Sequence, residues 1–420
     1  MVMNLHDEIV RMGDQAVRAA RELARLSTRR KNAILEAMAE ELEARRATIR
    51  EINQAEVKAA RETGLPPAMC DRLELTDKRM DSMIRGLRNV IALKDPIGTR
   101  ISRWIRPNGL VIQKVRVPIG VIAIIYESRP NVTADTAVLC VKTSNAVILR
   151  GGKEALKTNR AIVDAMVEGG RRRGLPEHAI QFIDTPDREA IRELVQLVGR
   201  VDLVIPRGGE GLIRSVVEMA RVPVIKHYKG VCHVYVHEKA DPEMALRIVE
   251  NAKCQMPSVC NAMETLLVDE AIAESFLPRC AQLLRSRGVE LRGCERSRQI
   301  VPDMKPATEE DWYAEYCDLI LAIRVVPGID EAIRHIETYG SHHSDAIVTS
   351  DPVAACRFTE EVDSAAVYVN ASTRFTDGGE FGMGAEIGIS TDKIHARGPM
   401  GLEELTSYKY VVLGTGQIRE

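Results

Sequence analysis

The chain has 420 residues, of which 45% are hydrophobic and 28% are charged, and its formal net charge is -2. This length predicts two or three domains, and the composition is that of an ordinary globular protein. A net charge so close to zero gives no global attraction to nucleic acid or to an anionic membrane. No stretch of the sequence approaches the roughly 20 apolar residues that a membrane helix needs.

The first residues and the cysteines indicate the cellular compartment in which the protein works. Asp7 and Glu8 stand where a secretory signal carries basic and then apolar residues. The nine cysteines are spread irregularly and form no CxxC pair, which argues against a disulfide framework or a zinc site. We therefore expect a reduced, cytoplasmic enzyme.

The first quarter of the chain is predicted to be helical. Residues 5–93 place apolar side chains at helical spacing among Glu and Arg, which predicts helices that cover a sheet. Two short strands, 103–106 and 110–115, flank Pro107-Asn108-Gly109 and predict a hairpin. Because an isolated hairpin is only marginally stable, we expect it to pack on another element or another subunit.

From residue 118 onward, strands alternate with helices, which predicts a doubly wound parallel sheet with ligand sites beyond the carboxyl ends of its strands. The expected strands of this sheet are 120–126, 146–149, 179–183, 201–205 and 222–225. A second α/β unit is expected to contain strands 232–237, 319–323 and 345–349. Residues 407–413 form a last strand that suits a sheet edge.

Two glycine-containing loops follow strands of the first sheet. One consists of Arg150, Gly151, Gly152 and Lys153, and the other contains Gly208, Gly209 and Gly211. Backbone amides at a helix start, with cations beside them, favour an anion such as phosphate. Glycines that serve only a tight strand-to-helix turn explain either loop equally well when it is taken alone. Two such loops in one sheet favour a dinucleotide.

Cys260 lies in a polar connector between an expected helix, 242–252, and an expected strand, 266–268. A thiolate in such a position is a strong nucleophile. Cysteine is also among the most commonly buried residue types, so a packing role is the alternative. His342 and His343 are adjacent in a later turn and suggest a metal, but no further ligand stands at a suitable spacing, and we expect no metal site.

Several longer stretches, together with this layout, resemble the aldehyde dehydrogenase superfamily over nearly the whole chain. These stretches are residues 126–133, 257–261, 332–347 and 401–410. The resemblance implies an α/β, aldehyde dehydrogenase-like fold with two doubly wound α/β domains and a small β oligomerisation element. The NADP-binding domain would comprise residues 1–100 and 118–228, the catalytic domain 229–397, and the hairpin with the C-terminal strand 101–117 and 398–420.

The resemblance also implies roles for single residues. Cys260 would be the catalytic thiol, and the Asn131 amide would help to bind the oxyanion of a tetrahedral intermediate. Arg150 takes the place of a lysine that contacts the adenine ribose. Lys153 stands where NAD-preferring relatives often carry a glutamate, and an ammonium there attracts the 2′-phosphate of NADPH. Candidate contacts to phosphate or to the substrate carboxylate are Arg129, His343 and Arg397, although salt bridges for the arginines and a structural turn for the histidine explain them equally well.

One departure from the superfamily bears on the reaction. Hydrolytic members carry a water-activating glutamate in the stretch that matches residues 224–229, and this chain has no acid there. Phosphate is then the expected exchange partner of a Cys260 thioester. The resemblance therefore implies NADPH-dependent reduction of L-glutamyl 5-phosphate to L-glutamate 5-semialdehyde and phosphate, the second step of proline biosynthesis.

Two alternative interpretations are open. One is a hydrolytic or acylating aldehyde dehydrogenase that uses NAD, and the other is a catalytically silent scaffold for the upstream kinase. The intact Cys260, Asn131 and glycine loops count against a silent scaffold. Association with a separate glutamate 5-kinase is left open by the sequence. The hairpin and the terminal strand predict a homo-oligomer of at least two subunits.

Overall fold

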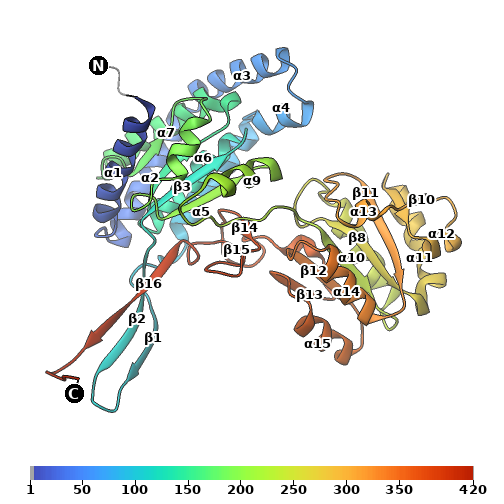
Figure 1. Ribbon diagram of the computed structural model, residues 1–420. Coiled ribbons are helices and arrows are strands. Elements are labelled where there is room, and N and C mark those ends of the chain that lie inside the picture. Colours follow the sequence, from blue (N-terminus) through green and yellow to red (C-terminus); the bar gives the residue numbers. More distant parts are fainter. Residues whose placement is uncertain (1–3, 420) are drawn as a thin grey trace. The chain divides into compact units, whose positions relative to one another are not determined.

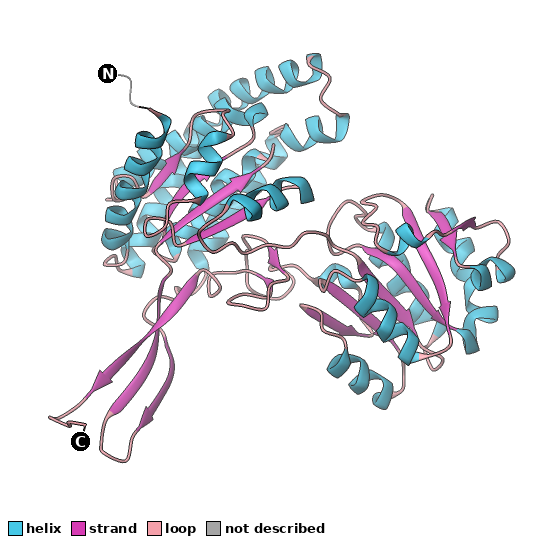
Figure 2. Ribbon diagram, viewed as in Figure 1, coloured by secondary structure: helices cyan, strands magenta, loops and turns pink. Residues whose placement is uncertain are grey.

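The computed structural model describes residues 4–419 and divides into two compact units (Figure 1, Figure 2). Unit 1 extends to Lys226 and also contains Gly382–Gly388 and the chain from Met400 onward. Unit 2 comprises His227–Phe381 and Ile389–Pro399. The expected boundary lay between residues 228 and 229, and the expected catalytic domain included the segment Gly382–Gly388 that the structure places in unit 1.

Amphipathic helices form the first part of unit 1, as the periodicity of residues 5–93 predicts. They are α1 (Leu5–Leu23), α2 (Thr28–Ala44), α3 (Arg46–Glu62), α4 (Pro67–Leu73) and α5 (Asp77–Ala92). The side chains of Asn4, Ser27 and Thr76 accept backbone N–H groups at the starts of α1, α2 and α5, respectively. Throughout residues 4–419, no helix combines the length and the apolar character that crossing a membrane requires.

A four-stranded parallel sheet of order β5-β4-β3-β6 forms the core of unit 1 and confirms the predicted alternation of strands and helices. Its strands are β3 (Val121–Tyr126), β4 (Ala146–Arg150), β5 (Ile180–Phe182) and β6 (Leu203–Arg207). The helices between and after them are α6 (Pro130–Lys142), α7 (Leu156–Arg171), α8 (Glu189–Val195) and α9 (Glu210–Met219), with a 3-10 turn, η1 (Lys153–Ala155), before α7.

The strand order of this sheet reverses at β3, because β4 and β5 lie on one side of it and β6 on the other. In open α/β sheets, ligands bind beyond the strand carboxyl ends at such a reversal. Gly151 directly follows β4 and Gly208 directly follows β6, so both predicted loops start at that edge. The fifth predicted strand, 222–225, makes only an isolated bridge between Val204 and Val224, since Pro223 has no N–H to donate to a ladder.

The predicted hairpin is present and belongs to an antiparallel sheet of order β1-β2-β16. β1 (Arg100–Ile105) and β2 (Val111–Pro118) form the hairpin, and β16 (Thr406–Leu413) pairs with β2 over its full length. Several large apolar side chains of this sheet are exposed, namely Ile101, Trp104, Ile105, Tyr408, Tyr410 and Val412. The terminal strand thus completes a sheet within its own chain, and the sheet exposes side chains of the kind that protein interfaces bury.

A seven-stranded parallel sheet of order β10-β9-β11-β8-β7-β12-β13 forms the core of unit 2. Its strands are β7 (Cys232–Val236), β8 (Met263–Asp269), β9 (Glu290–Gly293), β10 (Lys305–Pro306), β11 (Ile320–Val326), β12 (Ser344–Val348) and β13 (Ala366–Val369). Its helices are α10 (Pro242–Cys254), α11 (Glu270–Ser286), α12 (Glu295–Ile300), α13 (Glu309–Trp312), α14 (Ile329–Tyr339) and α15 (Pro352–Glu361). A 3-10 turn, η2 (Thr373–Phe375), follows β13, and β14 (Ile389–Ser390) pairs with β15 (Gly398–Pro399).

Both faces of this sheet are buried. Val234 and Leu266 belong to an apolar cluster on one face, and Tyr235 and Leu267 belong to a second cluster. The alternation follows from the two-residue period of a strand. The continuous apolar runs of β7 and β8 are therefore those of a parallel sheet covered by helices on both sides.

A buried ion pair joins the two elements that carry the Cys260 loop. Lys253, in the last turn of α10, places Nζ 2.6 Å from Oε2 of Glu264 near the start of β8, and both side chains are fully buried. Glu264 also accepts the backbone N–H of Cys317. Burial raises the pKa of the Glu264 carboxyl to about 7, and the Lys253 ammonium acts in the opposite direction. The pair holds the two ends of the loop together.

Replacing Lys253 by Met is expected to leave Glu264 buried without its cation and to lower the free energy of unfolding by about 3–5 kcal/mol. Because the folded-state pKa of Glu264 lies above that of an unfolded glutamate, its ionisation destabilises the fold as the pH rises. The loss should therefore be larger at about pH 8 than at about pH 5, as measured by urea unfolding. The control Lys253→Met with Glu264→Leu should recover most of the loss, and an equally unstable double variant would contradict the charge argument.

Candidate active site

Cys260 lies on the loop between α10 and β8, and side chains from a distant segment hold this loop. The Thr373 hydroxyl donates to the Asn261 carbonyl at 2.7 Å, and Asn261 Nδ2 donates to the Thr376 carbonyl at 2.8 Å. Cys260 itself is half-buried. The backbone beside the thiol is thus fixed, while the thiol is accessible to a small molecule.

The backbone of Cys260 also packs against the chain that leads into β7. A Cβ atom built on Gly230 would lie 1.8 Å from the Cys260 carbonyl oxygen, so only glycine fits at this position. The Cys232 thiol donates to the same oxygen at 3.2 Å. Burial raises the pKa of Cys232 well above its ordinary value. This second thiol is therefore a hydrogen-bond donor that positions the loop.

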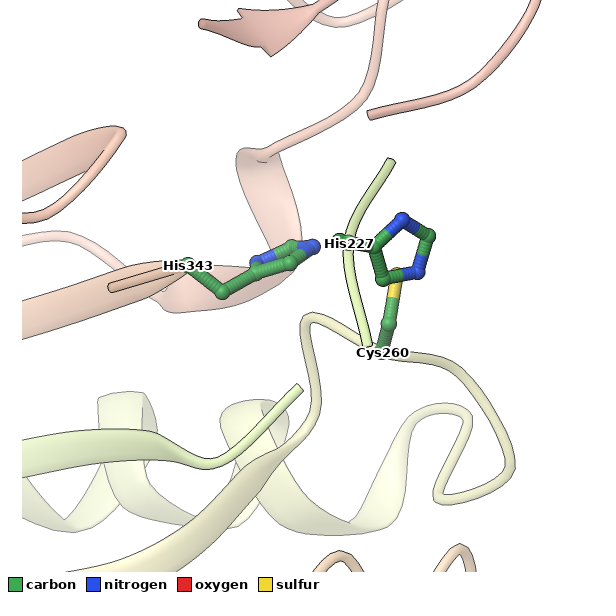
Figure 3. Close-up of side chains that lie close together, drawn as sticks. All are labelled: His227, Cys260 and His343. Carbon is green, nitrogen blue, oxygen red and sulfur yellow. The ribbon is translucent and has the colours of Figure 1, made fainter. Parts of the chain in front are cut away.

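Two histidines approach the Cys260 thiol (Figure 3). The Cys260 sulfur and one ring nitrogen from each of His227 and His343 all lie within 4.8 Å of one another. The centroids of the two rings are 5.6 Å apart, and the rings meet edge to face. His227 precedes β7 and His343 directly precedes β12, so three separate segments of unit 2 meet at the thiol.

Each imidazole is held through its Nδ1 atom. His227 Nδ1 lies 2.8 Å from the Ile389 carbonyl oxygen. Because a carbonyl can only accept, Nδ1 carries the hydrogen, and Nε2 of the neutral ring is the acceptor. Nε2 is the ring nitrogen that faces the sulfur in Figure 3. His343 Nδ1 lies 2.8 Å from the Ser344 hydroxyl, which contacts the Thr376 hydroxyl at 2.6 Å.

A thiol and two imidazoles are also residue types that bind zinc. Among the described His, Cys, Asp and Glu side chains, these three form the group that is close enough to hold an ion. The fixed tautomer of His227 and the accessible thiol of Cys260 suit a nucleophile with a proton-transfer partner, and we do not assign the group to a metal. The expectation that the chain binds no metal stays a prediction.

Arg374 places a positive charge beside this site. Its guanidinium donates to the side-chain oxygens of Gln255, at 2.7 Å, and of Asn261. Burial lowers the pKa of Arg374, and the negative charges that Cys260 and Asp377 can carry act in the opposite direction. Since a guanidinium does not lose its proton in proteins, Arg374 remains a cation. A nucleophile with a fixed cation nearby suits an anionic substrate.

Asn131 and Arg129 lie at the start of α6 in unit 1, directly beyond the carboxyl end of β3. Asn131 is exposed and donates through Nδ2 to Oδ2 of Asp135, one helical turn further on, at 3.1 Å. Burial raises the pKa of the Asp135 carboxyl to about 6. Arg129 is exposed as well. Both residues stand at the edge of the sheet where ligands of parallel sheets bind.

The predicted anion-binding loops of unit 1 border one pocket beyond the same edge. Of the predicted residues, Arg150, Gly152, Lys153 and Gly211 line it. Gly151, Gly208 and Gly209 lie next to these positions in the two loops. Arg188, just before α8, also lines the pocket, although the sequence did not suggest it.

The cations around this pocket differ in what they contact. Arg150 is buried and donates to the carbonyl oxygens of Gly151 and Pro186, each at 3.0 Å. It therefore ties two loops together. Lys153 and Arg188 are exposed at the pocket instead. These two side chains present the positive charge that a phosphate group would meet.

Arg397 lies in an ion pair of unit 2. Its guanidinium contacts the Asp363 carboxylate at 2.7 Å and donates to the Asp363 carbonyl at 2.8 Å. Lys393 shares this carboxylate, and together Lys393 and Arg397 lower the pKa of Asp363 to about 2. The structure thus shows the salt bridge that was the alternative for this arginine, and substrate binding by Arg397 stays a prediction.

Three residues around Cys260 are not among those predicted from the sequence, namely His227, Cys232 and Arg374. His227 lies within residues 224–229, so a search of that stretch for histidine as well as for acids would find it. Cys232 and Arg374 have no comparable local signal. Cys232 lies 28 residues from its partner Cys260 in the sequence, and Arg374 lies 113 residues from its partner Asn261.

Comparison with known proteins identifies relatives over the whole length of the chain. The profile described as "Aldehyde dehydrogenase family" matches residues 5–299. A protein of Carboxydothermus hydrogenoformans named gamma-glutamyl phosphate reductase is 58% identical over 413 residues, which cover 98% of this chain and 100% of the relative. A protein of the same name from Aquifex aeolicus is 55% identical over 426 residues, which cover 100% and 97%. The crystal structure of gamma-glutamyl phosphate reductase from Thermotoga maritima gives a TM-score of 0.97 at 51% identity, covering 99% of this chain and 100% of that one.

Replacing Gly230 by Ala should displace the Cys260 backbone, because the added methyl group would meet the Cys260 carbonyl. A misplacement of about 1 Å at a reacting group can cost roughly 100-fold in rate. We therefore expect a loss of that order in kcat, and slower alkylation of Cys260 by iodoacetamide. Gly379→Ala is the matched control, since its methyl group would meet only the Asp377 carboxylate. Unchanged alkylation and activity in Gly230→Ala would show that the loop position is unimportant.

Proposed function

We propose that this chain, an oxidoreductase that belongs to the aldehyde dehydrogenase family, uses NADPH to reduce L-glutamyl 5-phosphate. The products are L-glutamate 5-semialdehyde and phosphate. The observation that carries the proposal is the Cys260 thiol, which meets two imidazoles and lies near the Arg374 guanidinium. The full-length similarity to two proteins named gamma-glutamyl phosphate reductase supports the substrate.

The proposed reaction passes through a thioester on Cys260. The thiolate attacks the 5-acyl carbon of the substrate, and phosphate departs from the tetrahedral intermediate. The predicted donors to its oxyanion are the Asn131 amide and the Cys260 backbone N–H. A bound nicotinamide cofactor supplies the hydride that reduces the thioester. The thiohemiacetal that results releases the semialdehyde and regenerates the Cys260 thiolate.

Charge around the thiol supports an acyl phosphate as the substrate. L-Glutamyl 5-phosphate carries a phosphoryl group and a carboxylate, and both need cations or hydrogen-bond donors. Arg374 supplies a fixed positive charge near Cys260, and His343 supplies an imidazole. Arg129 and Arg397 stay candidates for the same role.

The pocket at the β3–β6 reversal supports NADPH as the reductant. Its residues suit a dinucleotide phosphate, because Lys153 and Arg188 expose two cations beside backbone of the glycine loops. Arg150 would act indirectly by holding the Gly151 and Pro186 loops. A glutamate at position 153, as in NAD-preferring relatives, would repel a 2′-phosphate, whereas the ammonium attracts it.

The alternative enzyme is a hydrolytic dehydrogenase that uses NAD and needs no phosphate. Full-length similarity to two gamma-glutamyl phosphate reductases favours the phosphate-dependent reaction. Assembly into at least a dimer is proposed because Trp104, Tyr408 and Tyr410 expose apolar surface on the β1-β2-β16 sheet. A cytoplasmic location and association with glutamate 5-kinase stay predictions from the sequence.

Lys153→Ala and Arg188→Ala should each weaken binding of 2′,5′-ADP by about 10- to 100-fold, the value of one lost hydrogen bond to a charged group. Binding of 5′-AMP should change little, because it lacks the 2′-phosphate. Isothermal titration of both nucleotides measures this without turnover. Lys157→Ala is the control, as it removes an exposed cation of α7 that does not line the pocket. If binding of both nucleotides weakened equally, Lys153 and Arg188 would not be the residues that bind the 2′-phosphate.

Cys260→Ala should abolish the reverse reaction, in which glutamate semialdehyde, NADP and phosphate yield NADPH. The absorbance of NADPH reports the rate, and the wild-type enzyme should depend on phosphate. The control Cys254→Ala removes another half-buried thiol of unit 2 and should keep activity. Turnover by the wild type without phosphate would identify a hydrolytic dehydrogenase. Full activity of Cys260→Ala would exclude the thioester route.

A further inference from the structure

Attack of a thiol on an acyl phosphate leaves two proton transfers to be made. The thiol must lose a proton to become the nucleophile, and the departing phosphate must gain one, since a fully deprotonated phosphate is a poor leaving group. In an active site that excludes water, both transfers are fastest when one side chain within reach of both atoms performs them. The structure places one imidazole where it can do so.

His227 has the required geometry. Its Nδ1–H donates to the Ile389 carbonyl, which leaves Nε2 as the acceptor atom. Of its two ring nitrogens, Nε2 lies on the side of the Cys260 sulfur (Figure 3), and the sulfur and one nitrogen of each ring lie within 4.8 Å of one another. The residue is half-buried, so part of its surface is open to a small molecule. Because the backbone carbonyl fixes the tautomer, the same nitrogen can first accept and then donate a proton.

We propose that His227 carries the proton of the Cys260 thiol to the departing phosphate. This inference rests on the acyl-phosphate reductase function proposed above and adds a second catalytic residue to it. Nε2 takes the thiol proton, the thiolate bonds to the acyl carbon, and the bond from that carbon to the phosphate oxygen breaks. The proton on Nε2 passes to this oxygen, so hydrogen phosphate leaves and His227 is neutral again. In reverse, His227 takes the proton from hydrogen phosphate as it attacks the thioester.

His343 does not share this role, although it also lies next to the thiol. Its ring is fully buried. Nδ1 contacts the Ser344 hydroxyl at 2.8 Å and lies 3.8 Å from the Cys232 sulfur. The Ser344 hydroxyl in turn contacts Thr376. The His343 ring also packs edge to face against His227 and so helps to position it.

His227→Gln tests the proposal, because the amide keeps a donor for the Ile389 carbonyl but cannot carry a proton. The thioester is formed in reverse with glutamate semialdehyde and NADP, and free aldehyde is removed by gel filtration because it would itself condense with hydroxylamine. The thioester is then discharged either by phosphate or by hydroxylamine. Hydroxylamine attacks thioesters as a neutral amine and needs no base. The readout is the ratio of the two rates, which cancels any effect of the substitution on thioester formation.

The expected ratio of phosphate- to hydroxylamine-supported discharge of the thioester in His227→Gln is about 100- to 10,000-fold lower than in the wild type, the usual contribution of general acid–base catalysis. The control His342→Asn alters an exposed neighbouring histidine and should leave the ratio unchanged. An unchanged ratio in His227→Gln would overturn the inference. A Cys260→Ala enzyme that still forms NADPH would instead overturn the proposed function, so the two failures are distinguishable.

Discussion

The carbonyl group of Cys260 is the point on which the arrangement around the thiol depends. Gly230 abuts its oxygen so closely that no side chain fits, and the Cys232 thiol donates to the same atom. Both residues belong to the segment that also contains His227, only three residues before Gly230. One stretch of chain therefore fixes the backbone of the nucleophile and brings the imidazole to it. The contact of His227 Nδ1 with the Ile389 carbonyl then holds the ring beside the thiol.

Charge and hydrogen bonding around the site are arranged to keep this geometry rigid. The Lys253–Glu264 pair joins the two ends of the Cys260 loop, and both side chains are fully buried from water. On the opposite side, Thr376 contacts the hydroxyls of Ser344 and Tyr368, and burial raises the pKa of Tyr368 to about 12. A phenol that keeps its proton is a constant member of this network. Residues that touch no substrate thus account for much of the order around the thiol.

The sequence predicts features that depend on neighbouring residues better than it predicts contacts between distant segments. The parallel strands of unit 1, the hairpin and the Cys260 loop carry local signals, namely apolar runs, a Pro-Asn-Gly turn and a polar connector. The structure contains them except for the strand expected at 222–225, which makes only an isolated bridge. Strands β9, β10 and β13 escaped prediction because they are short and all three lie at or next to a sheet edge. Arg374 escaped because its role arises only when separate segments meet, whereas His227 escaped because only acids were sought in residues 224–229. Pattern predicts elements, and tertiary packing decides which side chains share a site.

The pairing of β16 with β2 has a consequence for how the chain folds during synthesis. The connection between the two strands, residues 119–405, is about two thirds of the chain, and all of unit 2 lies within it. During synthesis β2 is made long before its partner β16, and all seven strands of the large sheet of unit 2 are made between the two. Unit 2 can therefore acquire its structure while one edge of β2 is still unpaired, and β16 closes that edge once it has been made. Until then this edge of β2 is a template for pairing with another nascent chain, and the making of β16 removes that template.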